Sequence, residues 1–239
     1  IGALAYGTES VAKVDKIVGP GGPWVTAAKL AVYGVCGVDL PAGPSESAVV
    51  VDSSADPRIV AADVMCQAEH GEESAVALVA VGEQTAERVI AEIEAVLPTL
   101  ERSDTVRAAL ENFGVVVTTP TVEDAAAVAN RWAPEHLSIH TREANEVASS
   151  IPNAGSVFVG HWTPESAGDY ATGANHVLPT GGLARAYGPL ATEDFGSWRQ
   201  VQTLTEEGLR CLAPTIRTLA TTEGLTAHAY AVDVRLGGR

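Results

Sequence analysis

Residues 47–81 read SAVVVDSSADPRIVAADVMCQAEHGEESAVALVAV, and this stretch decides the fold. It begins and ends with apolar runs, Ser47–Asp52 and Ala75–Val81, which have the length and composition of buried strands. Between them, Asp56 and Pro57 supply an N-cap and a first-turn proline, which predict a helix reaching about His70. A strand, a helix and a second strand in this order form a βαβ unit with parallel strands.

The same alternation continues toward the carboxyl end. We expect, in order, helix 83–97, strand 115–118, helix 122–132, strand 137–140, helix 142–151 and strand 156–159. Strands separated by helices of this length predict a Rossmann-like α/β domain with a mostly parallel sheet. A final helix is expected at 206–219, followed by a short extended end at 231–236, so that the chain closes with a small helical tail.

The first 44 residues have a different character. A glycine-rich turn at Gly19–Gly22 precedes a predicted helix at Val25–Tyr33, which resembles the end of a preceding α/β unit. The chain starts with Ile1 inside an apolar run, without a basic segment before a long apolar one. We therefore expect no signal peptide and interpret the chain as part of a longer polypeptide.

Charge and composition exclude several kinds of binding partner. The formal net charge is −15, with 15 Lys and Arg against 30 Asp and Glu, and such a surface repels nucleic acids and anionic membranes. No run of 18 apolar residues occurs, so no transmembrane helix is expected. An acidic, lysine-poor surface also suits a salt-rich cytoplasm, because salt screens the repulsion between its charges. We therefore hypothesise that the protein comes from a salt-adapted organism.

The three cysteines give little sign of a disulfide framework. Cys36, Cys66 and Cys211 are odd in number and show no CxxC spacing. This usage is typical of a reducing compartment, and we expect a cytoplasmic protein. Cys66 lies beside a candidate motif but is interpreted as a small buried hydrophobic residue.

Two motifs combine an imidazole with other polar groups. Gln67 and His70 are three residues apart at the end of a predicted helix and share one of its faces, where a solvated helix end is the alternative to a metal site. Glu135 and His136 are adjacent in the sequence APEHL, and Pro134 ends the preceding helix, so both should lie in a loop at a strand edge. Such a pair can transfer protons, although a chance pair in a surface loop is the alternative.

Two further stretches near the carboxyl end are rich in polar groups. Residues 163–180, TPESAGDYATGANHVLPT, are predicted to form one long loop that holds Asp169 and His176. Structureless loops of this length are usually functional. The sequence EGLTAH at 223–228 ends in His228, which could reach a partner chain from an exposed tail or be simply solvated.

Four of these side chains would together suit a zinc ion, since they supply two nitrogens and two oxygens and leave room for a substrate ligand. They are Gln67, His70, Asp169 and His228. No local spacing proves that they converge.

Taken in order, eight segments resemble the histidinol dehydrogenase family. They are KVDKIVGPG (13–21), VTAAK (25–29), PAGPSE (41–46), QAEHG (67–71), APEHL (133–137), AGSVFVG (154–160), PESAGDYATGANHVLPT (164–180) and EGLTAH (223–228). The resemblance spans nearly the whole chain and is far more specific than any single motif. It implies an enzyme that oxidises L-histidinol to L-histidine through the aldehyde, reducing two NAD⁺.

The resemblance also implies roles for individual residues. Glu135 and His136 match the catalytic pair of the family. The implied zinc ligands are Gln67, His70, Asp169 and His228, and the implied substrate-contacting residues are Ser45, Gln67, His70, His136, Asp169, His176, Glu223 and His228. The family further implies a homodimer with a shared active site, to which the tail of one subunit contributes across the interface.

Two departures from the family pattern affect the expected binding of NAD. Family members are nearly twice this length, so residues 1–44 would be a remnant of the NAD-binding domain, 45–190 the zinc and substrate domain, and 191–239 the dimer-crossing tail. The family has an asparagine that contacts NAD where this chain has Gly22, so that cofactor contact lacks its side-chain amide. Three alternatives follow: an enzyme for another amino- or sulfo-substituted alcohol, a non-catalytic zinc- and ligand-binding chain, and a zinc hydrolase using Glu135.

Overall fold

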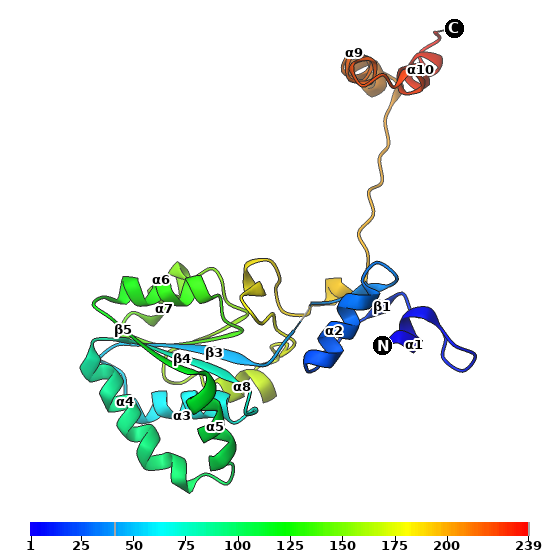
Figure 1. Ribbon diagram of the computed structural model, residues 1–239. Coiled ribbons are helices and arrows are strands. Elements are labelled where there is room, and N and C mark those ends of the chain that lie inside the picture. Colours follow the sequence, from blue (N-terminus) through cyan, green and yellow to red (C-terminus); the bar gives the residue numbers. More distant parts are fainter. Residues whose placement is uncertain (41, 239) are drawn as a thin grey trace. The chain divides into compact units, whose positions relative to one another are not determined.

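The computed structural model describes residues 1–40 and 42–238 of the chain (Figure 1). These residues form two compact units, Ile1–Gly196 and Ser197–Arg239. The proposed functional division at residue 44 lies inside the first unit and stays a prediction.

The first unit contains an α/β sandwich preceded by a small amino-terminal segment. Its strands are β1 Lys16–Ile17, β2 Gly37–Val38, β3 Glu46–Val51, β4 Ala75–Val81, β5 Gly114–Thr119, β6 His136–His140 and β7 Ser156–Val159. Its α-helices are α1 Gly2–Tyr6, α2 Pro23–Val32, α3 Pro57–Ala68, α4 Glu83–Val96, α5 Ser103–Phe113, α6 Val122–Trp132, α7 Ala144–Ser150 and α8 Glu165–Tyr170. Short 3₁₀ turns lie at Leu97–Thr99, Leu183–Arg185 and Thr192–Phe195.

The main sheet has five parallel strands in the order β5-β4-β3-β6-β7. Strand β3 is central and pairs with β4 on one side and with β6 on the other, where Ser47 is in register with His136. This confirms the predicted α/β fold with a parallel sheet. The jump from β5 across the sheet to β6 places the chain segments around residues 45 and 135 next to each other.

Helices cover both faces of the sheet because successive strand residues point to opposite sides. Val49 and Val51 of β3 pack with α3, α4 and α5, whereas Ala48 and Val50 pack with α6 and α7. Figure 1 shows α3, α4 and α5 below the sheet and α6 and α7 above it. Burial on both faces explains why the strands read as continuous apolar runs instead of alternating ones.

The amino-terminal segment has its own two-stranded parallel sheet, β1 and β2, and a small apolar core. A buried ion pair ties its glycine-rich turn in place. Lys29 Nζ lies 2.5 Å from Asp39 Oδ1 and also donates to the carbonyl oxygen of Gly19, while Gly19 N–H donates to Asp39 Oδ2 at 2.7 Å. The turn before α2 is thus held by Lys29 of α2 and by Asp39, which follows β2.

The second unit is a helix pair, α9 Glu206–Thr222 and α10 Thr226–Arg235, which pack on each other. Thr205 caps α9 by accepting from the N–H of Gly208. The prediction of an extended end at 231–236 is wrong, because the β-branched residues there continue α10. Among residues 1–40 and 42–238, no helix combines the length and apolar character that crossing a membrane requires.

Two helices depart from the expected element order. Helix α5 at Ser103–Phe113 was not predicted, and its buried Val106 and Ala109 complete the core under β4. Helix α8 lies within residues 163–180, so the prediction of one structureless loop there is wrong. Helix α8 brings two acidic residues of that segment, Glu165 and Asp169, onto one helical face because they are four positions apart.

Candidate functional site

The polar site lies at the amino edge of the sheet. Ser45 and Glu135 directly precede β3 and β6, and His136 is the first residue of β6. Helix α3 runs back from the carboxyl edge, so its last turn, with Gln67, and the following His70 reach the same place. Parallel sheets usually bind ligands at the carboxyl edge, and this site therefore depends on helix ends and strand beginnings brought together by the fold.

A pocket of about 280 Å³ opens at this edge. It combines groups from five separate stretches of the chain. The lining residues are Pro20, Gly21, Gly22, Ala42, Gly43, Ser45, His70, Glu135, His136, Asp169, His176, Val177 and Leu178. Six residues predicted to belong to the site, Ser45, His70, Glu135, His136, Asp169 and His176, therefore line one cavity, together with the Gly22 of the glycine-rich turn.

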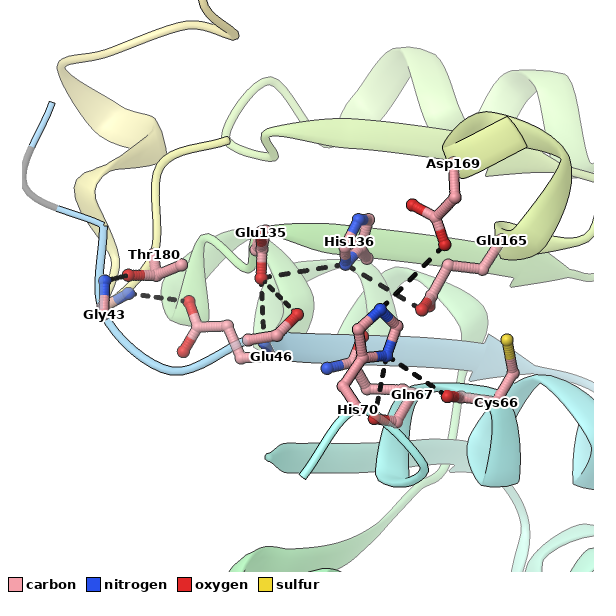
Figure 2. A network of polar contacts seen from close by, with 12 residues as sticks. Gly43, Glu46, Cys66, Gln67, His70, Glu135, His136, Glu165, Asp169 and Thr180 are labelled. Atoms are coloured by element: carbon pink, nitrogen blue, oxygen red, sulfur yellow. Dashed lines mark hydrogen bonds and ion pairs between the residues drawn. The ribbon is translucent and has the colours of Figure 1, made fainter. Parts of the chain in front are cut away.

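Glu135 is buried and held in a fixed position (Figure 2). Its Oε2 accepts a hydrogen bond of 2.7 Å from Ser45 Oγ and one of 3.0 Å from the backbone N–H of Glu46. Burial raises the pKa of Glu135 to about 7, against the lowering effect of these two bonds. A carboxyl group with this pKa can exchange a proton near neutrality.

His136 is buried between Phe158 and the imidazole of His70. Its ring centroid lies 5.8 Å from that of Phe158 and 6.5 Å from that of His70. Burial, with a smaller contribution from His70, lowers the pKa of His136 to about 4. The imidazole is therefore neutral at physiological pH, the form in which it can accept a proton.

Gln67, His70 and Asp169 supply candidate metal ligands. His70 Nε2 lies 4.0 Å from Asp169 Oδ2, and His70 Nδ1 lies 3.3 Å from the carbonyl oxygens of both Cys66 and Gln67. A proton on Nδ1 shared with these carbonyls leaves Nε2 free to bind a cation, as in many metal-bound histidines. The side-chain amide of Gln67 is fully buried, and neither of its polar atoms has a partner among the described residues.

The remaining implied ligand and one substrate residue lie in the other compact unit. His228 is in α10 and Glu223 caps α9, both exposed on the unit Ser197–Arg239. Within the described part of the chain, no group of three or more His, Cys, Asp or Glu is gathered closely enough to hold a metal ion. The four-ligand set is thus not assembled by the first unit, and its completion by His228 stays a prediction.

Three buried polar residues at this edge were not singled out from the sequence. Glu46 Oε1 accepts from the N–H of Gly181 at 2.9 Å, and Thr180 Oγ1 accepts from the N–H of Gly43 at 2.5 Å, so both tie the 180–182 loop to β3. Glu165 Oε1 lies 4.0 Å from His136 Nδ1 (Figure 2). Glu165 could have been recognised from the sequence by its spacing of four residues from Asp169. That spacing places two side chains on one face only in a helix, and no helix was predicted there.

Fold and site together define an α/β protein whose pocket combines an imidazole, buried carboxyl groups and candidate metal ligands. The chain belongs to the histidinol dehydrogenase family: the family model described as "Histidinol dehydrogenase" matches residues 1–236. This confirms the resemblance inferred from the motifs.

Individual relatives agree with the family assignment. The histidinol dehydrogenase of Photobacterium profundum is 47% identical over 239 residues, covering 99% of this chain and 54% of that protein. That of Escherichia coli is 48% identical over 239 residues, covering 99% and 55%. The crystal structure of the Elizabethkingia anophelis histidinol dehydrogenase superposes with a TM-score of 0.94 at 40% identity, covering 99% of this chain and 55% of that one. The chain spans about half the length of the relatives it matches.

Proposed function

We propose that this chain carries the substrate and metal side of a histidinol dehydrogenase, which oxidises L-histidinol to L-histidinal and then to L-histidine with two NAD⁺. The observation that carries the proposal is the buried pair Glu135–His136, which opens into the same pocket as His70 and Asp169. Membership of the family supports the substrate assignment.

Two residues that line the pocket, His70 and Asp169, and the buried Gln67, which does not line it, fit a zinc ion. The buried amide of Gln67 has no partner among the described residues, which costs free energy unless a ligand satisfies it. His70 Nε2 and Asp169 Oδ2 lie 4.0 Å apart, and an imidazole nitrogen and a carboxylate oxygen are both donor atoms that suit zinc. We assign Gln67, His70 and Asp169 as ligands, with His228 as the fourth. When bound, zinc would hold the imidazole and amine of histidinol by Lewis-acid coordination.

His136 is proposed as the general base of both oxidations. Its neutral imidazole can take the proton of the substrate hydroxyl group as hydride leaves for the nicotinamide. The surrounding Phe158 and the burial of the ring exclude water from this step. The same ring can take the proton of the hydrated aldehyde in the second oxidation.

Glu135 is proposed to act between the two oxidations. The aldehyde must gain a water molecule before a second hydride can leave, and a carboxylate beside His136 can activate that water. Ser45 and the Glu46 N–H hold Oε2 of Glu135 in place. Ser45 is thus proposed to hold the carboxyl group of Glu135 in position, in addition to the substrate contact that the family resemblance implies for Ser45. His176 lines the pocket and Glu223 is assigned to substrate by the family resemblance.

The hydride acceptor is proposed to bind largely outside this chain. NAD⁺ supplies the electron-accepting nicotinamide, and the chain's own contribution is the turn Gly19–Gly22, which borders the pocket. Gly22 has no side-chain amide to offer a cofactor. Since the relatives are about twice as long, we assign most of the NAD site to their amino-terminal half.

We also propose a cytoplasmic homodimer with a shared active site. Glu223 and His228 are exposed on the helical unit Ser197–Arg239, and the family resemblance implies that this tail contributes to the pocket of a partner subunit. Mixing a His70→Ala chain with a His228→Ala chain tests this. Restored zinc binding in the mixture supports exchange of tails, and a mixture of folded, dimerising chains that still binds no zinc contradicts it.

The function is tested in a full-length polypeptide, built by placing the amino-terminal half of a relative before this chain. NADH formation from histidinol and from histidinal is followed separately. His136→Asn should slow both oxidations by about 10²–10⁴-fold, whereas Glu135→Gln should slow mainly the second. The exposed Glu146→Gln serves as the control and should leave both rates unchanged. No NADH from histidinol with the unsubstituted polypeptide, despite intact folding, would refute the proposal.

This chain on its own should bind histidinol in the presence of zinc but produce little NADH. Hydride transfer needs its acceptor to be held against the substrate, and that positioning would require the rest of the NAD site. Calorimetric titration and an NADH assay on the chain of verified mass decide this. Rapid turnover by the chain alone would place the NAD site within these residues.

A further inference from the structure

One buried carboxyl group at the site is left unexplained by the roles assigned above. Glu165, the first residue of α8, has no exposed surface. Neither of its oxygens accepts or donates a hydrogen bond within residues 1–40 and 42–238. Burying a carboxyl group without a partner is costly, so its retention at this position calls for a function.

Two complementary groups lie near this carboxyl group: the buried hydroxyl of Ser47, which lowers the pKa of Glu165, and the imidazole of His136. Glu165 Oε1 lies 4.0 Å from Nδ1 of that ring, and Nδ1 is itself buried without a hydrogen-bond partner among the described residues (Figure 2). Two unpartnered groups, one able to donate and one able to accept, therefore face each other. A movement of about 1 Å would bring them to hydrogen-bond distance.

Glu135 is a less suitable partner for the same nitrogen. Its Oε2 lies 3.8 Å from His136 Nδ1, but that oxygen already accepts hydrogen bonds from Ser45 Oγ and the Glu46 N–H. Both oxygens of Glu165 remain free of hydrogen bonds to the rest of the described chain. The carboxyl group available to receive a proton from Nδ1 is thus the one on α8.

Helix α8 is packed tightly enough to hold Glu165 there. A Cβ atom on Gly168 would meet the ring of Phe158 at 2.7 Å, so α8 lies directly against β7. Phe158 in turn packs on the imidazole of His136. Phe158 therefore contacts both the ring of His136 and the helix that carries Glu165.

We propose that Glu165 is a positioning residue for His136. Its carboxylate accepts a hydrogen bond from Nδ1–H, which fixes the ring and leaves Nε2 unprotonated as the base. This inference rests on the proposed function of His136. When Nε2 takes the proton from the substrate hydroxyl group, the imidazolium formed is paired with the carboxylate, as in other His–carboxylate pairs.

The first test is kinetic and uses the full-length polypeptide loaded with zinc. Glu165→Gln should lower kcat for histidinol by about 10²-fold with KM changed less than about threefold, because the group acts through the base and not on the substrate. In a His136→Ala background the same substitution should cost less than about twofold. An additive loss in the double variant, or a raised KM with unchanged kcat, would overturn the proposal. Glu146→Gln again provides the exposed glutamate control.

The second test does not depend on turnover or on the variant folding. ¹⁵N NMR of the histidine-labelled, unsubstituted protein reports which ring nitrogen of His136 carries the proton. We expect the Nδ1–H form, and an Nε2–H form would contradict the proposal. If the unsubstituted enzyme shows this form yet does not oxidise histidinol, the proposed function fails while the Glu165–His136 interaction stands.

Discussion

The carbonyl oxygen of Glu135 lies 2.6 Å from the point that a Cβ atom would occupy on Gly155, so these two residues meet backbone to backbone. Hydrogen bonds run alongside this contact, from Gly155 N–H to Pro134 O at 2.9 Å and from Ser156 N–H to Glu135 O at 2.8 Å. The residues that begin β7 thus support the backbone of the proposed catalytic pair, Glu135 and His136. A glycine is required here because of the close approach and not because of an unusual backbone angle.

Gly155→Ala should therefore damage both stability and catalysis. The added methyl group forces the Glu135 backbone or Pro179 to move, which should lower the free energy of unfolding by about 1–3 kcal/mol. Denaturant unfolding and NADH assays measure the two effects. Gly188→Ala is the matched control, since a Cβ atom there has no neighbour within 4 Å. Equal stability of the two variants would show that the site tolerates the shift.

Removing a proposed zinc ligand from α3 should remove the metal. Gln67→Ala and His70→Ala should each lower zinc content well below one ion per site, because each takes away one of few donors. Glu69→Gln is the control, since this exposed residue lies between them in the sequence. Elemental analysis after dialysis measures the content. Full zinc occupancy in both alanine variants would refute the ligand assignment.

Loss of the Ser45 hydroxyl group should shift the pH dependence of histidinal oxidation upward. The bond from Ser45 favours the carboxylate form of Glu135, so Ser45→Ala should raise the pKa of Glu135 above about 7. Histidinal oxidation by the variant would then reach its half-maximal rate at a higher pH. Ser54→Ala, at an exposed serine that bonds Asp52, is the control. An unchanged pH profile in Ser45→Ala would contradict the role given to this bond.

In metal-free protein, Glu165 should make stability fall as pH rises. Its folded pKa of about 8 exceeds the ordinary value of 4.5, so its contribution is fully present below about pH 4.5 and is lost as pH rises toward 8. Glu165→Gln removes this pH-dependent loss of stability. The Tm of the variant should therefore decline less between pH 5 and pH 8.5 than the Tm of the unsubstituted protein. Expressed as the free energy of unfolding, the loss caused by Glu165 over this pH range should be at most about a few kcal/mol. Parallel Tm curves would show that Glu165 gains no proton on folding.

Much of the fold could be predicted because its signals are local. The apolar runs at Ser47–Asp52 and Ala75–Val81 and the capped helix after Asp56 appear where expected, and the sheet is parallel. Two errors arose where packing outweighs local preference. The six-residue α8 contains Gly168 and is held against Phe158, and the end of α10 is helical despite its valines because it packs on α9.

The sequence by itself determined the family, the α/β class and most of the chemical groups of the site, because these depend on residue types in a fixed order. Only the tertiary structure decided how those groups meet. Ser45 and Glu135 are ninety positions apart in the chain and are joined at 2.7 Å through the pairing of β3 with β6. Glu165 lies against His136 because α8 packs on β7. Contacts of this kind depend on strand order and helix packing, which no local pattern of residues specifies.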